Sequence, residues 1–366
     1  MSVPDNQPPD NHLVIIEMFC GGSHKQLIQH LLSLAPDTTL LTLSDKKWHW
    51  RARCGALQLL PQLQTISRPV TTLFMTSVGS LPEVVGLCPQ LRDARKVLYF
   101  HENQLVYPTQ GERERDYQFG YNQIMSALMA DLILFNSSYN LNSFLGTVDS
   151  FLNKMPDYKP KGVAELIRRK SEVLYFPVEF QLEGSQVRDP KVLHIVWPHR
   201  WEHDKNPVDF FNSLTSLISS GLHFKVSVLG KTYQDVPDIF REFQSSHPDY
   251  ITQWGPLDSR EDYLTHLRTC DVIVSTAVHE FYGVAMLEGL WAGCFPLAPN
   301  RLSYPEIYPA ECLYNTPAQL TKQLRQLCKN PGLARRKWEK VVGQVDMTRY
   351  SWDGLKARYS EVLSIG

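Results

Sequence analysis

A repeated alternation of short apolar runs with segments of helical length is the feature that most constrains the fold of this chain. The runs of the first half are rich in β-branched residues and lie at 13–19, 39–43, 72–77, 96–100 and 131–137. Between them, apolar residues recur at helical spacing, as in 118–130. Strands that are apolar on both faces and joined by helices are typical of parallel sheets. The pattern therefore predicts an α/β fold.

The same alternation starts again in the second half. Apolar runs at 191–198, 224–230 and 250–255 alternate with helical segments, and two further runs flank a helical segment at 284–292. Two such series of about 180 residues each predict two Rossmann-like, doubly wound domains that face each other across a cleft. We expect an N-terminal domain over 1–180, a linker over 181–190, a second domain over 191–348, and a C-terminal helix over 349–366 that could pack on the first domain.

Composition and charge exclude several classes of protein. The formal net charge of −1 gives no global field that would attract a nucleic acid. The 7 cysteines are scattered, without a CxxC motif or a Cys/His cluster, which argues against a disulfide framework and a zinc site. The polar N-terminus carries no signal peptide, and no apolar stretch is long enough to span a membrane. We expect a monomeric protein of the cytoplasm that does not bind a membrane. A second pool in the nucleus is compatible with the sequence.

Two carboxylates lie in the apolar stretch "HEFYGVAMLEGLWAGC" at 279–294. Glu280 precedes Gly283 in the loop that leads into the helical segment, and Glu288 falls on the apolar face of that segment. A buried carboxylate needs hydrogen-bond donors, and the hydroxyls of a ribose are suitable. Gly283 leaves the helix N-terminus open, where N–H groups bind anions. An anion and a polyol together indicate a nucleotide sugar, whereas the alternative is a partly exposed glutamate at the edge of the apolar face.

A second candidate segment, "WPHRWEHDKNP" at 197–207, follows the first apolar run of the second half. Its cations Arg200 and Lys205 can converge on a diphosphate, because a guanidinium fork and an ammonium both suit phosphate oxygens. The alternative is a solvated loop with two surface cations. The sequence contains no Asp-x-Asp pair that could hold Mg²⁺, so we expect Arg200, Lys205 and a helix dipole to neutralise the diphosphate without a metal.

Two loops of the first half follow apolar runs and could also reach a ligand. "CGGSH" at 20–24 contains Gly22, but it lacks the G-x-G-x-x-G pattern of dinucleotide-binding dehydrogenases. "YFHENQLVYP" at 99–108 places His101 directly after a run. A histidine at such a position is more often structural than catalytic, and both interpretations stay open for His101.

The segment "DKKWHWRARCG" at 45–55 interleaves cations with aromatic side chains. Such a surface suits single-stranded nucleotides, since cations pair with phosphates and aromatic rings stack on bases. A second basic cluster lies between Lys159 and Lys170. The alternative for both clusters is solvated charge with the aromatic rings packed in the core. The candidate RNA-binding residues of the first cluster are Lys46, Lys47, Trp48, Trp50, Arg51 and Arg53.

These motifs resemble those of known glycosyltransferases. "HEFYGVAMLEGLWAGCFPLAP" resembles the E-x₇-E motif of retaining glycosyltransferases with the GT-B fold, and "PHR…DKN" resembles their donor site. Together with "GGSHKQL", "KKWHWRAR", "LYFHENQLVYP", "FGYNQI" and "FNSSYN", they resemble the tRNA-queuosine α-mannosyltransferases over nearly the full chain. The resemblance implies transfer of mannose from GDP-mannose to queuosine in the anticodon loop of tRNA-Asp, with retention, giving mannosyl-queuosine. The implied partners are queuosine-containing tRNA and GDP-mannose, with no cofactor and no metal.

The resemblance also implies a role for each matching residue. His101, Arg200, Lys205 and Glu280 would be the catalytic groups, and "QWGP" at 253–256 would seat the base. Tyr282 and Val284 differ from the residues that often flank the glycine in relatives, so the shape of the sugar pocket is left open. The implied donor-binding residues are Gly22, Arg200, Lys205, Gly230, Trp254, Glu280, Gly283, Val284, Ala285 and Glu288.

Three other functions are compatible with the same motifs. A GT-B transferase with another nucleotide sugar and a protein, lipid or small-molecule acceptor would share the donor residues and differ in the acceptor surface. A nucleotide-sugar-binding protein would not need Glu280, Arg200 and Lys205 together. A sugar-nucleotide epimerase would not need the basic and aromatic segment at 45–55.

Overall fold

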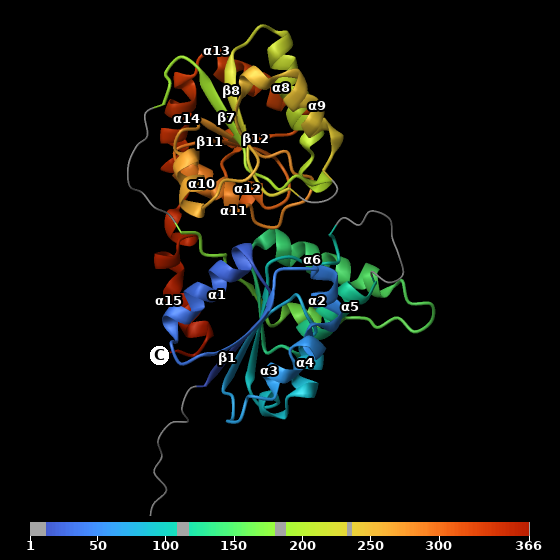
Figure 1. Ribbon diagram of the computed structural model, residues 1–366. Coiled ribbons are helices and arrows are strands. Elements are labelled where there is room, and N and C mark those ends of the chain that lie inside the picture. Colours follow the sequence, from blue (N-terminus) through green and yellow to red (C-terminus); the bar gives the residue numbers. More distant parts are fainter. Residues whose placement is uncertain (1–11, 108–116, 180–187, 233–235, 366) are drawn as a thin grey trace, which may run out of the picture. The chain divides into compact units, whose positions relative to one another are not determined.

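The computed structural model describes residues 12–107, 117–179, 188–232 and 236–365 (Figure 1). The chain divides into two compact units. The first comprises the residues up to Pro177 together with those from Thr348 onwards, and the second runs from Val178 to Met347. Most of the expected linker at 181–190 lies outside the described residues.

The first unit contains a six-stranded parallel sheet in the order β2-β1-β3-β4-β5-β6. Its central strands are buried on both faces, which explains why they read as continuous apolar runs. The order reverses between β1 and β3, so ligands are expected at the carboxyl ends of these strands. The strands are β1 Leu13–Cys20, β2 Thr39–Ser44, β3 Thr72–Thr76, β4 Arg95–Phe100, β5 Leu132–Phe135 and β6 Ser171–Val173.

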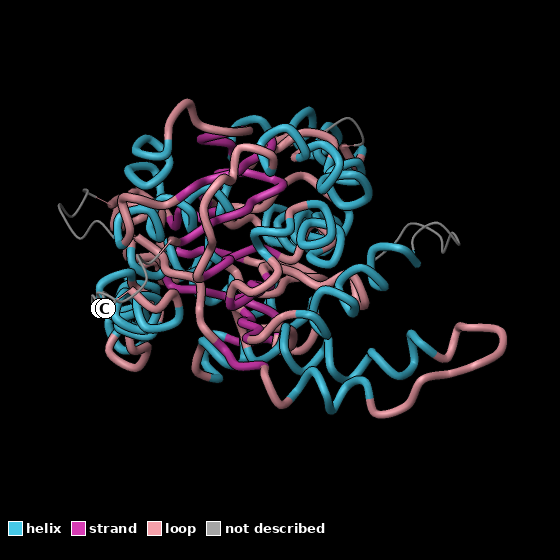
Figure 2. Tube along the Cα trace, turned by 90° about the horizontal axis from the view of Figure 1, so that it is seen from below, coloured by secondary structure: helices cyan, strands magenta, loops and turns pink. Residues whose placement is uncertain are grey.

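Helices alternate with the strands along the first unit, and Figure 2 shows the helices of the whole chain in cyan beside the magenta strands. Ser137 begins α6 by accepting a hydrogen bond from the backbone N–H of Asn140, which is the usual role of a serine N-cap. The helices of the first unit before its last segment are α1 Gly22–Leu34, α2 Trp48–Gln58, α3 Leu60–Leu63, α4 Leu81–Leu87, α5 Tyr117–Met129, α6 Ser138–Leu152 and α7 Val163–Arg168, with a 3₁₀ turn at Pro89–Leu91.

The C-terminal helix, α15 Trp352–Val362, belongs to the first unit although it follows the second in sequence. Arg358 donates to both carboxylate oxygens of Glu172 at 2.7 and 2.8 Å. The hydroxyl of Tyr359 donates to the carbonyl of Tyr175 at 2.9 Å. These contacts fix α15 against the segment around β6.

The second unit contains another six-stranded parallel sheet, in the order β12-β11-β10-β7-β8-β9. Counted along the chain this is the order 3-2-1-4-5-6 of dinucleotide-binding Rossmann folds, and the order reverses between β7 and β10. The strands are β7 Leu193–Trp197, β8 Phe224–Val228, β9 Ile251–Trp254, β10 Val272–Val274, β11 Phe295–Pro299 and β12 Leu313–Tyr314.

Local sequence explains where the helices of the second unit begin. Asn206 caps α8 through Asp209 N and is followed by Pro207, which suits a first helical turn. Ser259 and Thr316 cap α10 and α13 in the same way. The helices are α8 Pro207–Ser219, α9 Asp238–Ser246, α10 Arg260–Leu267, α11 Val284–Trp291, α12 Tyr304–Ile307, α13 Pro317–Lys329 and α14 Gly332–Val342, with 3₁₀ turns at His203–Lys205, Pro248–Tyr250 and Ala310–Cys312, and at Met347–Arg349 before α15.

The predicted α/β class with two doubly wound sheets is confirmed. Each apolar run assigned to a strand forms one, with bounds shifted by a few residues. Of the helices in the described ranges, none combines the length and apolarity that a membrane crossing requires.

Candidate active site

Four of the candidate donor residues of the second unit lie in the loops at the carboxyl ends of β7 and β10, where the strand order reverses. The loop after β7 carries Arg200 and Lys205, and the loop after β10 carries Glu280 and Gly283. Backbone hydrogen bonds join the two loops, because Val278 N donates to the carbonyl of Asp204 at 2.9 Å. The sheet topology therefore brings together segments that are about 75 residues apart in the sequence.

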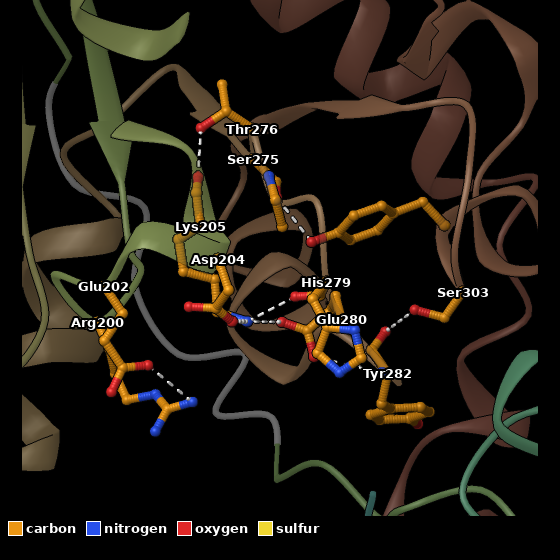
Figure 3. A network of polar contacts seen from close by, with 12 residues as sticks. Arg200, Glu202, Asp204, Lys205, Ser275, Thr276, His279, Glu280, Tyr282 and Ser303 are labelled. Atoms are coloured by element: carbon orange, nitrogen blue, oxygen red, sulfur yellow. Dashed lines mark hydrogen bonds and ion pairs between the residues drawn. The ribbon is translucent and has the colours of Figure 1, made fainter. Parts of the chain in front are cut away.

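Lys205 is the centre of this network (Figure 3). Its side chain is 8% exposed, and Nζ lies 3.1 Å from Asp204 Oδ2 and 3.5 Å from Glu280 Oε2. Nζ also donates to the carbonyl of His279 at 2.8 Å, while Thr276 Oγ1 donates to the backbone carbonyl of Lys205. The two carboxylates and the carbonyl offset the cost of burying the ammonium charge, and together they fix the position of Nζ.

The Glu280 carboxylate remains ionised at neutral pH. Burial alone would raise the pKa of Glu280, but the charge of Lys205 and the hydrogen bond from Tyr282 N lower this pKa to about 2. An ionised carboxylate only accepts hydrogen bonds, so it can bind sugar hydroxyls but cannot supply a proton. This chemistry agrees with the expected contact to the sugar.

Gly283 holds the loop against the start of α11 in a conformation that favours glycine. Its φ is +94°, and a Cβ at this position would lie 3.0 Å from the ring of Tyr304. The Tyr304 hydroxyl is hydrogen-bonded to Ser275 Oγ at 2.7 Å, which fixes the ring. Val284 and Ala285 begin α11 before its first backbone hydrogen bond, from Met286 N to Gly283 O. Their N–H groups form the kind of helix start that binds anions.

Tyr282 lies in the same loop. Its carbonyl accepts a hydrogen bond from Ser303 Oγ at 2.9 Å, and its side chain is buried. The tyrosine is thus part of the packed wall behind the loop.

Arg200 differs from Lys205 in being half exposed. Its Nη2 lies 3.2 Å from Glu202 Oε2, and Figure 3 shows this pair apart from the Lys205–Glu280 pair. Its charge makes a smaller contribution than that of Lys205 to the lowering of the pKa of Glu280. The structure thus places Arg200 in the same loop as Lys205, with its own carboxylate partner.

Gly230 lies two residues after β8, and Trp254 is the last residue of β9. Gly230 has a φ of +102°, and a Cβ there would lie 2.1 Å from the carbonyl oxygen of His199. Glycine is needed at this close approach of two backbones. Trp254 is half-buried and packs against Trp201 with ring centroids 5.2 Å apart. Trp254 therefore borders the aromatic core of the unit.

Glu288 lies on the buried face of α11, as its spacing predicts, and is 5% exposed. Its Oε1 lies 2.8 Å from Arg260 Nη1. Burial raises the pKa of Glu288, and the opposing effects come from Arg260 and a hydrogen bond with Tyr263. A buried carboxylate needs a partner, but no local motif connects these two side chains of α10 to Glu288, so the sequence does not identify them.

The first unit holds the remaining candidates, Gly22 and His101. Gly22 opens α1 with a φ of +54° and leaves open space where a Cβ would lie. His101 follows β4, and Asn136 Nδ2 donates to its carbonyl at 2.7 Å. His101 stacks on His24, a residue of "CGGSH" to which the sequence analysis gave no role, and His24 is hydrogen-bonded to the buried Glu17.

The segment at 45–55 leads into α2 and forms most of that helix. Lys46, Lys47 and Trp50 are exposed, and Trp50 is 58% exposed. Arg51 is hydrogen-bonded to Ser44 and Gln58. These side chains form a basic surface with one exposed aromatic ring.

The ring of Phe119 lies against two of the candidate RNA-binding residues. Trp48 is partly buried and packs against the hydrophobic core and against Phe119, with ring centroids 5.1 Å apart. Arg53 lies over the same Phe119 ring at 4.5 Å. In the second basic cluster, Arg168 and Arg169 pair with Glu165. That cluster is therefore partly neutralised.

Two groups of described residues could offer ligands to a metal ion, and neither includes a residue of the Lys205–Glu280 network. In the first, Glu17, His24 and His101, the two imidazole rings are stacked, which does not suit joint coordination. In the second, His194, His266 and Cys270, the hydroxyl of Ser227 already bonds both imidazoles at 2.8 and 2.7 Å.

The buried imidazoles near Lys205 make stability depend on pH. Burial, followed by the charge of Lys205, lowers the pKa of His199 from 6.5 to about 3. Below pH 6.5 His199 therefore binds a proton in the unfolded chain but stays neutral in the folded state. The free energy of unfolding consequently falls as the pH falls. Between pH 7.5 and 5.5 the wild type loses free energy of unfolding, and we expect His199→Gln to lose about 1.4 kcal/mol less. Urea unfolding at the two pH values measures this difference. His223→Gln, at an exposed position of the same unit, is the matched control, and an equal pH dependence in wild type and His199→Gln would contradict the prediction.

Comparisons with known proteins identify the family. A family model for the N-terminal part of tRNA-queuosine alpha-mannosyltransferases matches residues 12–178. The chain is 45% identical to the tRNA-queuosine alpha-mannosyltransferase of Drosophila melanogaster over 368 residues, which covers 96% of each protein.

Solved structures with little sequence identity share the fold. A glycosyltransferase from Rickettsia africae is 14% identical with a TM-score of 0.65, covering 98% of this chain and 100% of that one. HepE of Anabaena, solved with UDP, is 12% identical with a TM-score of 0.66, covering 96% and 99%. OtsA is 12% identical with a TM-score of 0.67 over the same shares. The fold is GT-B, and the 45% identity along nearly the whole sequence shows that the chain belongs to the tRNA-queuosine α-mannosyltransferase family.

Proposed function

We propose that this protein transfers mannose from GDP-mannose to the cyclopentenediol of queuosine in tRNA, with retention of configuration. The observation that carries the proposal is the Lys205–Glu280 network beside the start of α11, in a chain of this family. The network combines a fixed cation with an ionised carboxylate, which suit the diphosphate and the sugar hydroxyls of one nucleotide sugar. The cytoplasmic location, with room for a nuclear pool, and the monomeric state stay predictions from the sequence.

We assign the donor contacts as follows. Lys205, Arg200 and the N–H groups of Val284 and Ala285 would bind the diphosphate, since all of them are positive or carry partial positive charge. Glu280 would accept hydrogen bonds from the mannose hydroxyls. The other donor contacts are assigned to Gly22, Gly230, Trp254, Gly283 and Glu288, whose carboxylate Arg260 would orient towards the ribose.

The proposed mechanism needs no protein nucleophile. The carboxylate of Glu280 is paired with Lys205. We therefore assign it to binding the sugar hydroxyls and not to nucleophilic attack. In a front-face transfer the acceptor hydroxyl attacks on the side from which the diphosphate departs, and a phosphate oxygen takes its proton. The protein then acts by positioning the acceptor and by stabilising the leaving diphosphate with Lys205 and Arg200. His101 would lie beside the reacting sugar.

Incubation with bulk tRNA and a panel of labelled nucleotide sugars tests the donor and the class of acceptor. We expect label in tRNA from GDP-mannose alone, and nucleoside analysis should place it on queuosine. Label from a UDP-sugar, or transfer to a protein or lipid but not to tRNA, would replace the proposed function by that of another GT-B transferase. Donor binding without any transfer would indicate a nucleotide-sugar-binding protein.

The exposed cations before α2 provide a test of tRNA binding. We expect Lys46→Ala/Lys47→Ala to weaken tRNA binding and to lower the slope of log Kd against log salt by about 1.5, because two phosphate contacts are lost. Binding measured by fluorescence anisotropy across a salt series gives both quantities. Lys322→Ala/Lys329→Ala removes the same charge from exposed positions of α13 and serves as the control. Unchanged affinity and slope in the first variant would reject this surface.

A further inference from the structure

A buried carboxylate and two imidazoles meet in the first unit, outside the donor network just described. Glu17 comes from β1, His24 from the first turn of α1, and His101 from the end of β4. Glu17 is 0% exposed, and its Oε2 lies 2.9 Å from His24 Nδ1. Its other oxygen accepts a hydrogen bond from Phe19 N at 2.7 Å. The carboxylate is therefore fixed at both oxygens, and it fixes the ring of His24 in turn.

His24 stacks on His101. The two ring centroids are 3.9 Å apart and the planes are inclined by 30°. Tyr99 and Phe176 contact the His101 ring on other sides, at 4.9 and 5.8 Å. His101 is 8% exposed, and its Nε2 has no hydrogen-bond partner among the described residues. A buried nitrogen without a partner is costly in a folded protein unless a ligand satisfies it.

The surroundings shift the pKa values of the two imidazoles in opposite directions. Burial would lower the pKa of His24, but Glu17, through its charge and hydrogen bond, and then Glu102 raise it above its usual value. Burial, followed by the charge of His24, lowers the pKa of His101 well below 6.5. The shifts are opposite in direction, so an added proton is bound more readily by His24 than by His101.

We propose that His24, held by Glu17, is a positioning residue that fixes the ring of His101, so that Nε2, which has no partner among the described residues, can bond the substrate. The inference rests on the proposed function, in which His101 lies beside the reacting sugar. A neutral imidazole can donate or accept one hydrogen bond at Nε2, so it can meet a sugar hydroxyl or a phosphate oxygen without adding charge. Packing alone would not require a carboxylate beneath the stacked pair.

Kinetics of matched variants test this inference. We expect His24→Gln and Glu17→Gln to lower kcat for mannose transfer about 10-fold, with less than about a 3-fold change in KM for GDP-mannose, since a displaced catalytic ring costs rate more than binding. The acid limb of the kcat profile should move to higher pH in both variants, because His101 loses the neighbouring charge that keeps it neutral. His30→Gln is the control, since His30 is another buried histidine of α1 that stacks on an aromatic ring, Trp352 at 4.5 Å. Its kcat and acid limb should match the wild type.

A side-chain NMR titration of the wild type gives an independent readout. At pH 7 the ¹⁵N shifts should show His24 charged and His101 neutral, whichever substrate the protein uses. Wild-type kcat and an unmoved acid limb in His24→Gln and Glu17→Gln would overturn the inference, as would a neutral His24 at pH 7. Absence of transfer to queuosine by the wild type would instead reject the proposed function, and the titration would still decide the state of the pair.

Discussion

Replacing Lys205 with methionine should produce the largest combined loss of activity and stability. Nζ of Lys205 lies between the carboxylates of Asp204 and Glu280, at 3.1 and 3.5 Å. Without it two carboxylates remain together in a largely buried network, and we expect the free energy of unfolding to fall by about 3 kcal/mol. The leaving diphosphate also loses a fixed cation, so transition-state stabilisation should fall by about 3 kcal/mol, or about 150-fold in kcat/KM.

Two variants isolate the role of Lys205. Lys225→Met removes a lysine that is half exposed and lies 3.8 Å from Asp189, and it should leave kcat/KM and stability nearly unchanged. Lys205→Arg keeps the charge and should recover part of both losses. Urea unfolding and steady-state transfer from GDP-mannose give the two quantities. Normal turnover of folded Lys205→Met would remove this residue from the mechanism.

Arg200→Ala should lower activity without lowering stability. The Arg200 side chain is 46% exposed and pairs with Glu202, so its removal should change the unfolding free energy by less than about 0.5 kcal/mol. If the guanidinium binds the leaving diphosphate, kcat/KM should fall by about 150-fold, the scale of about 3 kcal/mol for one electrostatic donor.

The matched control for this variant is Arg241→Ala. Arg241 is 80% exposed and pairs with Asp238 within α9, so it should change neither quantity measurably. Near-normal turnover of Arg200→Ala would show that Lys205 and the start of α11 suffice for the diphosphate. A marked loss of stability would instead mean that Arg200 has a structural role.

The fold was predictable because a parallel strand that is buried on both faces appears in the sequence as an apolar run. Segments of helical length separate these runs. The helical spacing of Val284, Leu287, Glu288 and Trp291 likewise predicted that Glu288 lies on the buried face of α11. Recognition of the family is confirmed by the 45% identity to the Drosophila enzyme. These features depend on local pattern, which a single sequence contains.

Contacts between distant segments were not predictable in the same way. Arg260 and Tyr263 of α10 engage Glu288, and Glu17 holds His24, yet no motif marks either pairing. The roles of the aromatic residues around 48–50 also depend on packing, since Trp48 joins the core while Trp50 faces solvent. Two positions this close in sequence differ in burial because helix α2 turns them to different faces.

The central claim is that this protein mannosylates queuosine, and transfer to two matched tRNA preparations tests it most directly. The same tRNA should be prepared with queuosine and with guanosine at the modified position, then incubated with the purified protein and labelled GDP-mannose. We predict label in the queuosine-containing tRNA, none in the queuosine-free tRNA, and strongly reduced label with Lys205→Met. Equal labelling of both tRNAs, or labelling of neither by an enzyme that turns over GDP-mannose on another acceptor, would contradict the account.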